Sequence, residues 1–250
     1  MPPLKELKEI FEIPRIYEEE AWHSPAGRLV REIVFGMNDG VISTVSFLFG
    51  VVGAFASHQV VLISGLAEVL AGTVSMFFGG YLSTKSQQEF FENEIARERK
   101  EIEETPARER DEIRRIYRAK GFHDEKELDL VVERITADKK IWLKCMMEEE
   151  LGLILESMDS PFKVGTVVGA SFLVGGFIPL VPLIVLDTPL ALKTSLGFTG
   201  AALFLLGGIK TTITRRPWIK SGLEVLLIGI FAAAAGYLIG ILLKGIVKAG

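Results

Sequence analysis

Five segments of this chain are apolar over about 20 residues or more, which is the length that a helix needs to cross the ~30 Å hydrocarbon core of a bilayer. Within that core the backbone N–H and C=O groups must be paired inside the protein, and this favours α-helices. The segments lie approximately at residues 33–56, 60–82, 164–186, 190–209 and 222–243. The sequence therefore predicts an all-α membrane protein with five transmembrane helices.

The charged residues are segregated from these apolar segments. Charged residues make up 24% of the chain, which is an ordinary share for a soluble protein. Hydrophobic residues make up 49%, so the two kinds of residue must lie in different parts of the chain. Of 60 charged side chains, 36 lie between residues 83 and 162, an insert with a helical pattern between the second and third apolar segments. Thr105-Pro106 and the stretch 121–124 are typical of helix boundaries. We expect three helices in the insert, the third from about Glu125 to Ser157.

The same pattern predicts how the chain is organised and oriented. Basic residues near the ends of the spans gather on one side if the five helices alternate in direction, and such residues favour the cytoplasm. We therefore expect the N-terminus and the insert to be cytoplasmic, with the C-terminus outside the cell or in a lumen. The expected parts are an N-terminal segment at 1–32, helices 1 and 2 at 33–82, the charged helical domain at 83–162, and helices 3 to 5 at 163–250.

Acidic side chains inside the apolar segments are candidates for function, because a charge near the bilayer centre costs roughly 2.5–3.5 kcal/mol or more. Asp39 lies about six residues inside the first segment, and Met76 lies about as far from the same end of the antiparallel second segment. Glu68 lies about 12 Å farther along, at 1.5 Å per residue. Two acids at different depths, with a soft sulfur beside one, suit a path for a divalent metal or for protons. The alternative is that Met76 is packing material and that the acids hydrogen-bond neighbouring helices.

Acidic residues in the insert recur at a spacing that places pairs of them on one helix face. Two Glu-x-x-Glu pairs flank the expected hairpin at 105–106, and another Glu follows a methionine pair on the third helix. Clustered carboxylates repel one another unless a cation neutralises them, which favours a metal site. The alternative is an ordinary charged helix surface, in which arginines four residues before Glu101 and Glu112 form ion pairs. The candidate metal ligands are Glu98, Glu101, Glu109, Glu112, Met146, Met147 and Glu150.

Other classes of function find little support in the sequence. The three histidines are scattered, and the insert has no Glu-x-x-His for a ferritin-like oxidation centre. There is no phosphate-binding Gly-x-x-x-x-Gly-Lys, and the single cysteine, Cys145, excludes a cysteine-based metal site within one chain. The net charge of −4 implies no affinity for nucleic acid. We expect a protein that is not an enzyme.

Three motifs resemble the vacuolar iron transporter family. Phe-Gly-Met-Asn-Asp-Gly-Val-Ile-Ser-Thr at 35–44 resembles the signature of the first helix of that family. Ala67-Glu68, followed by Gly72, Ser75-Met76, Gly79-Gly80-Tyr81 and Ser83, resembles its second helix, and Met-Met-x-x-Glu-Leu-Gly-Leu at 146–153 resembles the end of its cytoplasmic domain. The similarity runs from about residue 28 to residue 243.

This resemblance implies a fold and a function. Family members have five membrane helices, with a three-helix cytoplasmic metal-binding domain between the second and the third. They are dimers that exchange ferrous iron, and often manganese or other divalent metals, for protons. By similarity, Asp39, Glu68 and Met76 line the ion path near the dimer seam, and the seven candidate ligands of the insert bind metal and deliver it.

The resemblance also implies the partners of the chain. These are divalent metal ions, protons, the lipid bilayer and a second copy, with transported or bound Fe²⁺ and no prosthetic group. The host membrane would be the plasma membrane in a prokaryote and the vacuolar membrane in a eukaryote. A second reading stays open, in which the chain is a membrane-anchored protein that binds or stores iron without transporting it.

Overall fold

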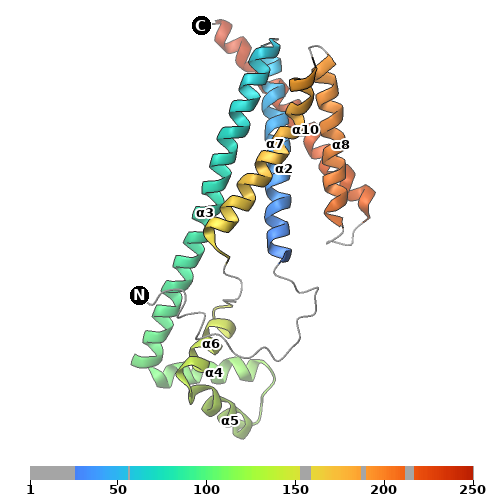
Figure 1. Ribbon diagram of the computed structural model, residues 1–250. Helices are drawn as coiled ribbons and strands as arrows, with labels where there is room; N and C mark the ends of the chain where they lie inside the picture. Colours follow the sequence, from blue (N-terminus) through green and yellow to red (C-terminus); the bar gives the residue numbers. More distant parts are fainter. Residues whose placement is uncertain (1–25, 56, 153–158, 187–189, 212–216, 250) are drawn as a thin grey trace. The chain divides into compact units, whose positions relative to one another are not determined.

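The computed structural model describes residues 26–55, 57–152, 159–186, 190–211 and 217–249. Within these ranges it contains eight α-helices and no β-strand (Figure 1). The helices are α2 Ala26–Ala54, α3 His58–Glu104, α4 Pro106–Ala119, α5 Glu125–Thr136, α6 Lys139–Glu149, α7 Pro161–Val185, α8 Leu190–Ile209 and α10 Trp218–Ala249.

Five of the described helices, α2, α3, α7, α8 and α10, are long and apolar enough to cross a membrane. The predicted all-α class and the five apolar helices are therefore confirmed. The helix α3 is longer than the segment expected at 60–82, since it continues without a break to Glu104 and has 47 residues.

The chain divides into two compact units, which we describe separately. The membrane unit comprises the described residues up to Thr84 and those from Ser160 onward, and the charged unit comprises those from Lys85 to Asp159. Each unit contains one part of α3, with the boundary between Thr84 and Lys85.

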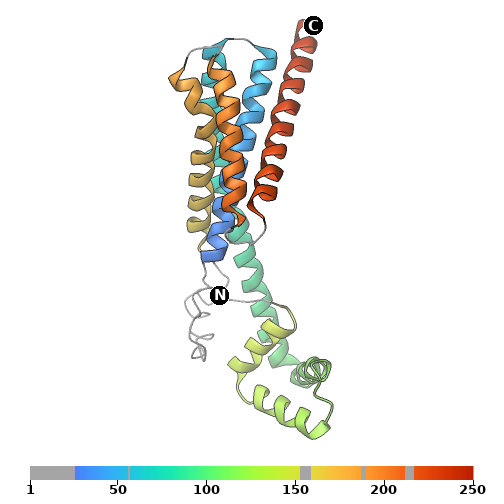
Figure 2. The same ribbon diagram turned by 90° about the vertical axis from the view of Figure 1, so that its right-hand side faces the viewer.

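In the membrane unit, α2 packs against α7 and α10, and α8 packs against the same two helices (Figures 1 and 2). Glycines allow these backbones to approach closely. A Cβ atom at Gly40 of α2 would collide with the carbonyl oxygen of Phe172 on α7, and one at Gly240 of α10 would collide with the carbonyl oxygen of Gly50 on α2. The helix α2 is therefore held by backbone-to-backbone contacts on two sides.

The charged unit is built around an apolar core from α3, α4, α5 and α6. One expectation for this unit is wrong, because the single helix expected from about Glu125 is two helices. The carboxylate of Asp138 accepts hydrogen bonds from the backbone N–H groups of Lys140 (2.7 Å) and Ile141 (3.4 Å), and so caps the start of α6. An aspartate in this role favours a helix start over helix continuation. The expected end of that helix, at 153–157, lies outside the described residues.

Candidate functional site

Two glutamates of the charged unit occupy positions that point into its core. On α3 the buried positions Phe91, Ile95, Glu98 and Ile102 recur at helical spacing, so Glu98 belongs to the stripe that faces inward. On α4 the two buried residues are Glu109 and Ile113, which are four residues apart. The exposed fractions of Glu98 and Glu109 are only 2% and 1%. Carboxylates buried to this degree need a partner.

These two glutamates are the centre of an acidic cluster. Carboxylate oxygens of Glu98, Glu101 and Glu109 lie within 4.8 Å of one another, and so do those of Glu109, Glu112 and Glu150. Glu109 belongs to both groups, which therefore adjoin. The structure thus brings together all five of the glutamates that the sequence nominates as ligands, from α3, from α4 and from the C-terminal end of α6.

Positive charge offsets only part of the burial at the inner end of the cluster, where Arg108 lowers the pKa of Glu109 by less than burial and Glu112 raise it. Both carboxylate oxygens of Glu109 and one of Glu98 are buried, and among the described residues their only hydrogen-bond partner is the carboxyl group of the other glutamate when one of the two is protonated. No lysine or arginine in the described ranges forms an ion pair with Glu98 or Glu109. At the rim, Arg108 pairs with Glu112 at 3.3 Å, as expected for an ordinary helix surface, whereas Arg97 pairs with Glu94 instead of Glu101.

Burial and mutual repulsion favour the protonated carboxyl groups here. Burial, followed by the neighbouring charges of Glu150, Glu109 and Glu101, raises the pKa of Glu98 to about 8. This residue lies outside the apolar part of α3, in the charged unit. Burial also raises the pKa of Glu109 and of Glu150, and the carboxylate of Glu112 adds to both effects. At neutral pH the carboxyl group of Glu98 is therefore mostly protonated unless a cation takes the place of the proton.

The methionines expected as ligands lie in the core of the charged unit. Met146 and Met147 are fully buried on α6 and pack in one cluster with Ile95, Ile113 and Trp142. Glu150, one turn after Met146, has its backbone N–H bonded to the Met146 carbonyl at 3.0 Å. These contacts show packing, and a role of the two sulfurs as ligands stays a prediction.

In the membrane unit, the three predicted path residues are half-buried. Glu68 of α3 accepts a hydrogen bond of 2.8 Å from the hydroxyl of Thr44 on α2. Asp39 directly precedes Gly40, where α2 meets α7. Met76 directly precedes Phe77, whose carbonyl oxygen would lie 2.6 Å from a Cβ atom at Gly165 of α7. All three residues therefore lie on helices that approach one another closely, and their role as an ion path stays a prediction.

The structure adds polar residues beside these acids that the sequence pattern alone does not single out. Thr44 is fully buried and bonds Glu68. The side-chain oxygens of Asn38 and Ser43 are buried and have no partner among the described residues. Their positions within an apolar segment, inside the motif at 35–44, are the sequence feature that could have pointed to a role for them.

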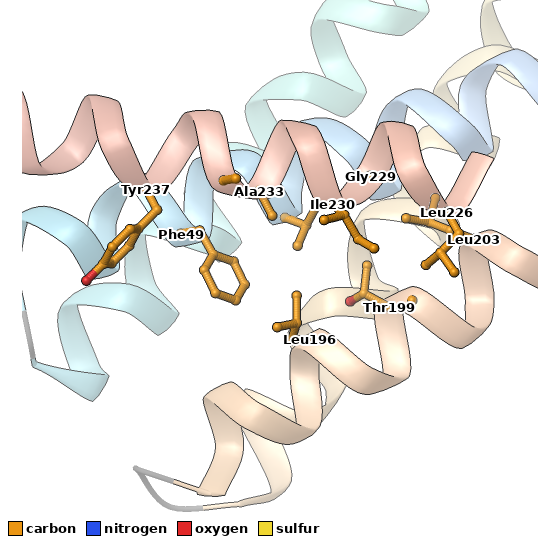
Figure 3. Close-up of a pocket in the computed structure, with 12 residues that line it drawn as sticks. Phe49, Leu196, Thr199, Leu203, Leu226, Gly229, Ile230, Ala233 and Tyr237 are labelled. Atoms are coloured by element: carbon orange, nitrogen blue, oxygen red, sulfur yellow. The ribbon is translucent and has the colours of Figure 1, made fainter. Parts of the chain in front are cut away.

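One apolar cavity of the membrane unit is lined by none of these acids. A cavity of about 490 Å³ opens between α2, α8 and α10, with Phe49, Leu196 and Ile230 among its lining residues (Figure 3). Its lining contains no acidic residue. This cavity is therefore unsuited to a metal ion, which prefers oxygen, nitrogen or sulfur ligands.

Comparison with known proteins gives a consistent result over most of the chain. Residues 30–241 match the model of the VIT family. Vacuolar iron transporter 1 of Oryza sativa subsp. japonica is 36% identical over 217 residues, which cover 86% of this chain and 85% of the relative. Vacuolar iron transporter 1 of Arabidopsis thaliana is 34% identical, with 86% of each chain covered. The vacuolar iron transporter of Plasmodium falciparum (isolate 3D7) is 33% identical, with 86% and 82% covered.

The family model spans both the apolar helices and the acidic insert. The two plant relatives also match over most of their own length, 85% and 86%. The chain therefore belongs to the VIT family.

Proposed function

We propose that this protein transports divalent metal, chiefly Fe²⁺ and also Mn²⁺, out of the cytoplasm in exchange for protons. The relatives bear the name vacuolar iron transporter, and the chain has five apolar helices with acidic residues inside two of them. In this proposal the protein is a transporter rather than an enzyme, and iron is its substrate.

The observation that carries the proposal is the pair of buried glutamates, Glu98 and Glu109, whose oxygens lack a cationic partner in the described chain. Five carboxylates offer hard oxygen ligands of the kind that divalent cations prefer. Protons and metal compete for the same oxygens, so a site of this composition takes up metal when it loses protons. We propose that the cluster collects the metal, with Met146 and Met147 as soft ligands.

We propose that Asp39, Glu68 and Met76 conduct the metal through the membrane. Carboxylates inside an apolar span are costly and mark ion or proton pathways. A thioether beside them favours softer transition metals over harder ions. The charged unit then faces the cytoplasm, the C-terminus lies on the opposite side, and a second copy of the chain completes a dimer. The membrane is vacuolar in a eukaryote and the plasma membrane in a prokaryote.

The proposal is tested by uptake of Fe²⁺ into proteoliposomes under an imposed pH gradient. Wild type should give uptake that collapses when the gradient is dissipated, and Asp39→Asn should abolish it. The matched control is Glu224→Gln, since Glu224 is also an acid on a membrane helix but is exposed and paired with Lys210 at 3.8 Å. Equal uptake by wild type and Asp39→Asn would refute the proposed path.

A second function, binding or storage of iron without transport, is favoured by one observation. The charged unit is compact and carries the buried acidic cluster by itself. The same proteoliposomes distinguish the two functions. Tight Fe²⁺ binding by the full-length protein, with no uptake above that of protein-free liposomes, would establish storage.

A further inference from the structure

Thr44 makes a hydrogen bond that is unusual for a threonine in a helix. Such hydroxyls commonly bond the carbonyl oxygen four residues earlier in their own helix. Thr73 does so with Val69 at 2.7 Å, and Thr166 does so with Phe162 at 2.8 Å. The hydroxyl of Thr44 instead reaches from α2 to α3 and donates to the Oε2 atom of Glu68 at 2.8 Å.

The hydrogen bond between Thr44 and Glu68 is enclosed by α7. Thr44 and Val69, which follows Glu68, are both fully buried. A Cβ atom at Gly176 of α7 would lie 3.1 Å from the Thr44 hydroxyl oxygen and 2.8 Å from Cγ2 of Val69. The backbone of α7 thus lies directly behind the threonine, and tight packing of this kind fixes a side-chain rotamer.

We infer that Thr44 is a positioning residue that holds Glu68 as a one-oxygen ligand for the permeating metal, an inference that rests on the proposed function. The hydroxyl takes one lone pair of Oε2 and fixes the orientation of the carboxylate, which disfavours binding of one ion by both oxygens relative to binding through a single oxygen. Calcium binds through six to eight oxygens and often takes both oxygens of one carboxylate, whereas smaller divalent ions accept fewer ligands. Thr44 therefore biases the path against Ca²⁺.

The experiment measures Fe²⁺ uptake into proteoliposomes in the presence of increasing Ca²⁺. Thr44→Val keeps the shape of the side chain but removes the donor, which frees both oxygens of Glu68. The Ca²⁺ concentration that halves Fe²⁺ uptake should fall about tenfold, the factor that one hydrogen bond to a charged group commonly supplies. Thr44→Ser keeps the donor and should stay within about twofold of wild type.

The matched control is Thr73→Val, because among the described residues the Thr73 hydroxyl bonds only the carbonyl oxygen of Val69 in its own helix. This variant should keep the Ca²⁺ sensitivity of wild type. A general loss of packing would lower Fe²⁺ uptake but would leave unchanged the Ca²⁺ concentration that halves it. A change in that concentration therefore indicates that the position of the Glu68 carboxylate has changed. If Thr44→Val does not fold, Thr44→Ala removes the donor with less bulk and carries the same expectation.

Unchanged Ca²⁺ sensitivity in a folded Thr44 variant without the donor would overturn the inference. An equal change in Thr44→Ser and Thr44→Val would also overturn it, since the hydroxyl would then be irrelevant. If wild type gives no Fe²⁺ uptake above protein-free liposomes, the proposed function fails and the inference fails with it. That outcome is recognised before any variant is compared.

Discussion

Glu98 and Glu109 occupy positions on α3 and α4 where the helical pattern places apolar side chains. Their burial, at 2% and 1% exposure, makes the ionised forms costly in the metal-free protein. A divalent cation would relieve this cost by neutralising the repelling charges. Metal binding at these two residues should therefore stabilise the folded protein.

The pH dependence of stability follows from the raised pKa of Glu98, about 8 compared with an ordinary value of 4.5. A carboxyl group whose pKa is raised by folding stabilises the protein fully below its unfolded pKa, and this stabilisation is lost as the pH rises through the folded pKa. The free energy of unfolding of the metal-free protein should fall between about pH 4.5 and about pH 8. Glu98→Gln, which cannot ionise, should show a shallower fall.

Thermal unfolding of both metal-free proteins across that pH range checks this prediction. Adding Fe²⁺ or Mn²⁺ anaerobically near pH 8 should stabilise wild type more than Glu98→Gln, because ligands stabilise the state that binds them. Parallel pH profiles for the two proteins would show that Glu98 ionises as it does in water.

Metal binding should also release protons. Near pH 7, which lies below the folded pKa of Glu98, the carboxyl group is mostly protonated and must lose its proton to bind a metal. Calorimetry of Mn²⁺ binding in buffers of different ionisation enthalpy should show net release of about one proton or more. The release should decrease in Glu98→Gln. A binding enthalpy that is independent of the buffer would contradict coupling between metal and protons at this site.

At the scale of the helices, glycine contacts determine how closely α2 and α7 approach. A Cβ atom at Gly40 would collide with the Phe172 carbonyl oxygen and would lie 2.8 Å from the backbone nitrogen of Gly176. A Cβ atom at Gly79 of α3 would meet nothing within 4 Å. The two glycines are thus a matched pair within apolar helices.

Gly40→Ala should destabilise the protein by about 1–3 kcal/mol, because the added methyl group forces two backbones apart. Gly79→Ala should be neutral or should stabilise by up to about 1 kcal/mol, since alanine is the better helix former. Thermal unfolding of the purified proteins in detergent measures both effects. Equal stability of the two variants would show that α2 and α7 have room for a methyl group between their backbones at Gly40.

The positions of the five apolar helices could be predicted from the sequence, whereas two features of the insert could not. Between Tyr81 and Thr105 the sequence has no glycine or proline, but it has Ser83, Ser86 and Asn93, each of which can cap a new helix, so the sequence alone does not show that α3 continues to Glu104. The break before α6 depends on Asp138, whose carboxylate bonds the N–H groups of Lys140 and Ile141. In a continuous helix those N–H groups would bond backbone carbonyl oxygens of the preceding turn instead, so the side chain and the helix compete for the same donors. Periodicity alone does not reveal that competition.

At the scale of the whole molecule, the acidic residues form two groups in two units. The spacing in the sequence predicts which glutamates of the charged unit share a helix face. Whether such a glutamate is buried depends on whether it lies on the same face of α3 as the core residues Ile95 and Ile102, as Glu98 does. The bond between Thr44 and Glu68 was not predictable, because it depends on the register between α2 and α3. Long-range register is a property of packing rather than of local pattern.

The central claim is that the acidic cluster collects metal and that the membrane acids conduct it. The concentration dependence of Fe²⁺ uptake into proteoliposomes tests it most directly, with wild type, Asp39→Asn and the double variant Glu98→Gln/Glu109→Gln. The double variant should need more Fe²⁺ for half-maximal uptake but should reach the maximal rate of wild type, whereas Asp39→Asn should show no uptake at any concentration. Uptake by Asp39→Asn at the wild-type rate, or an unchanged half-saturating concentration in the double variant, would contradict the claim.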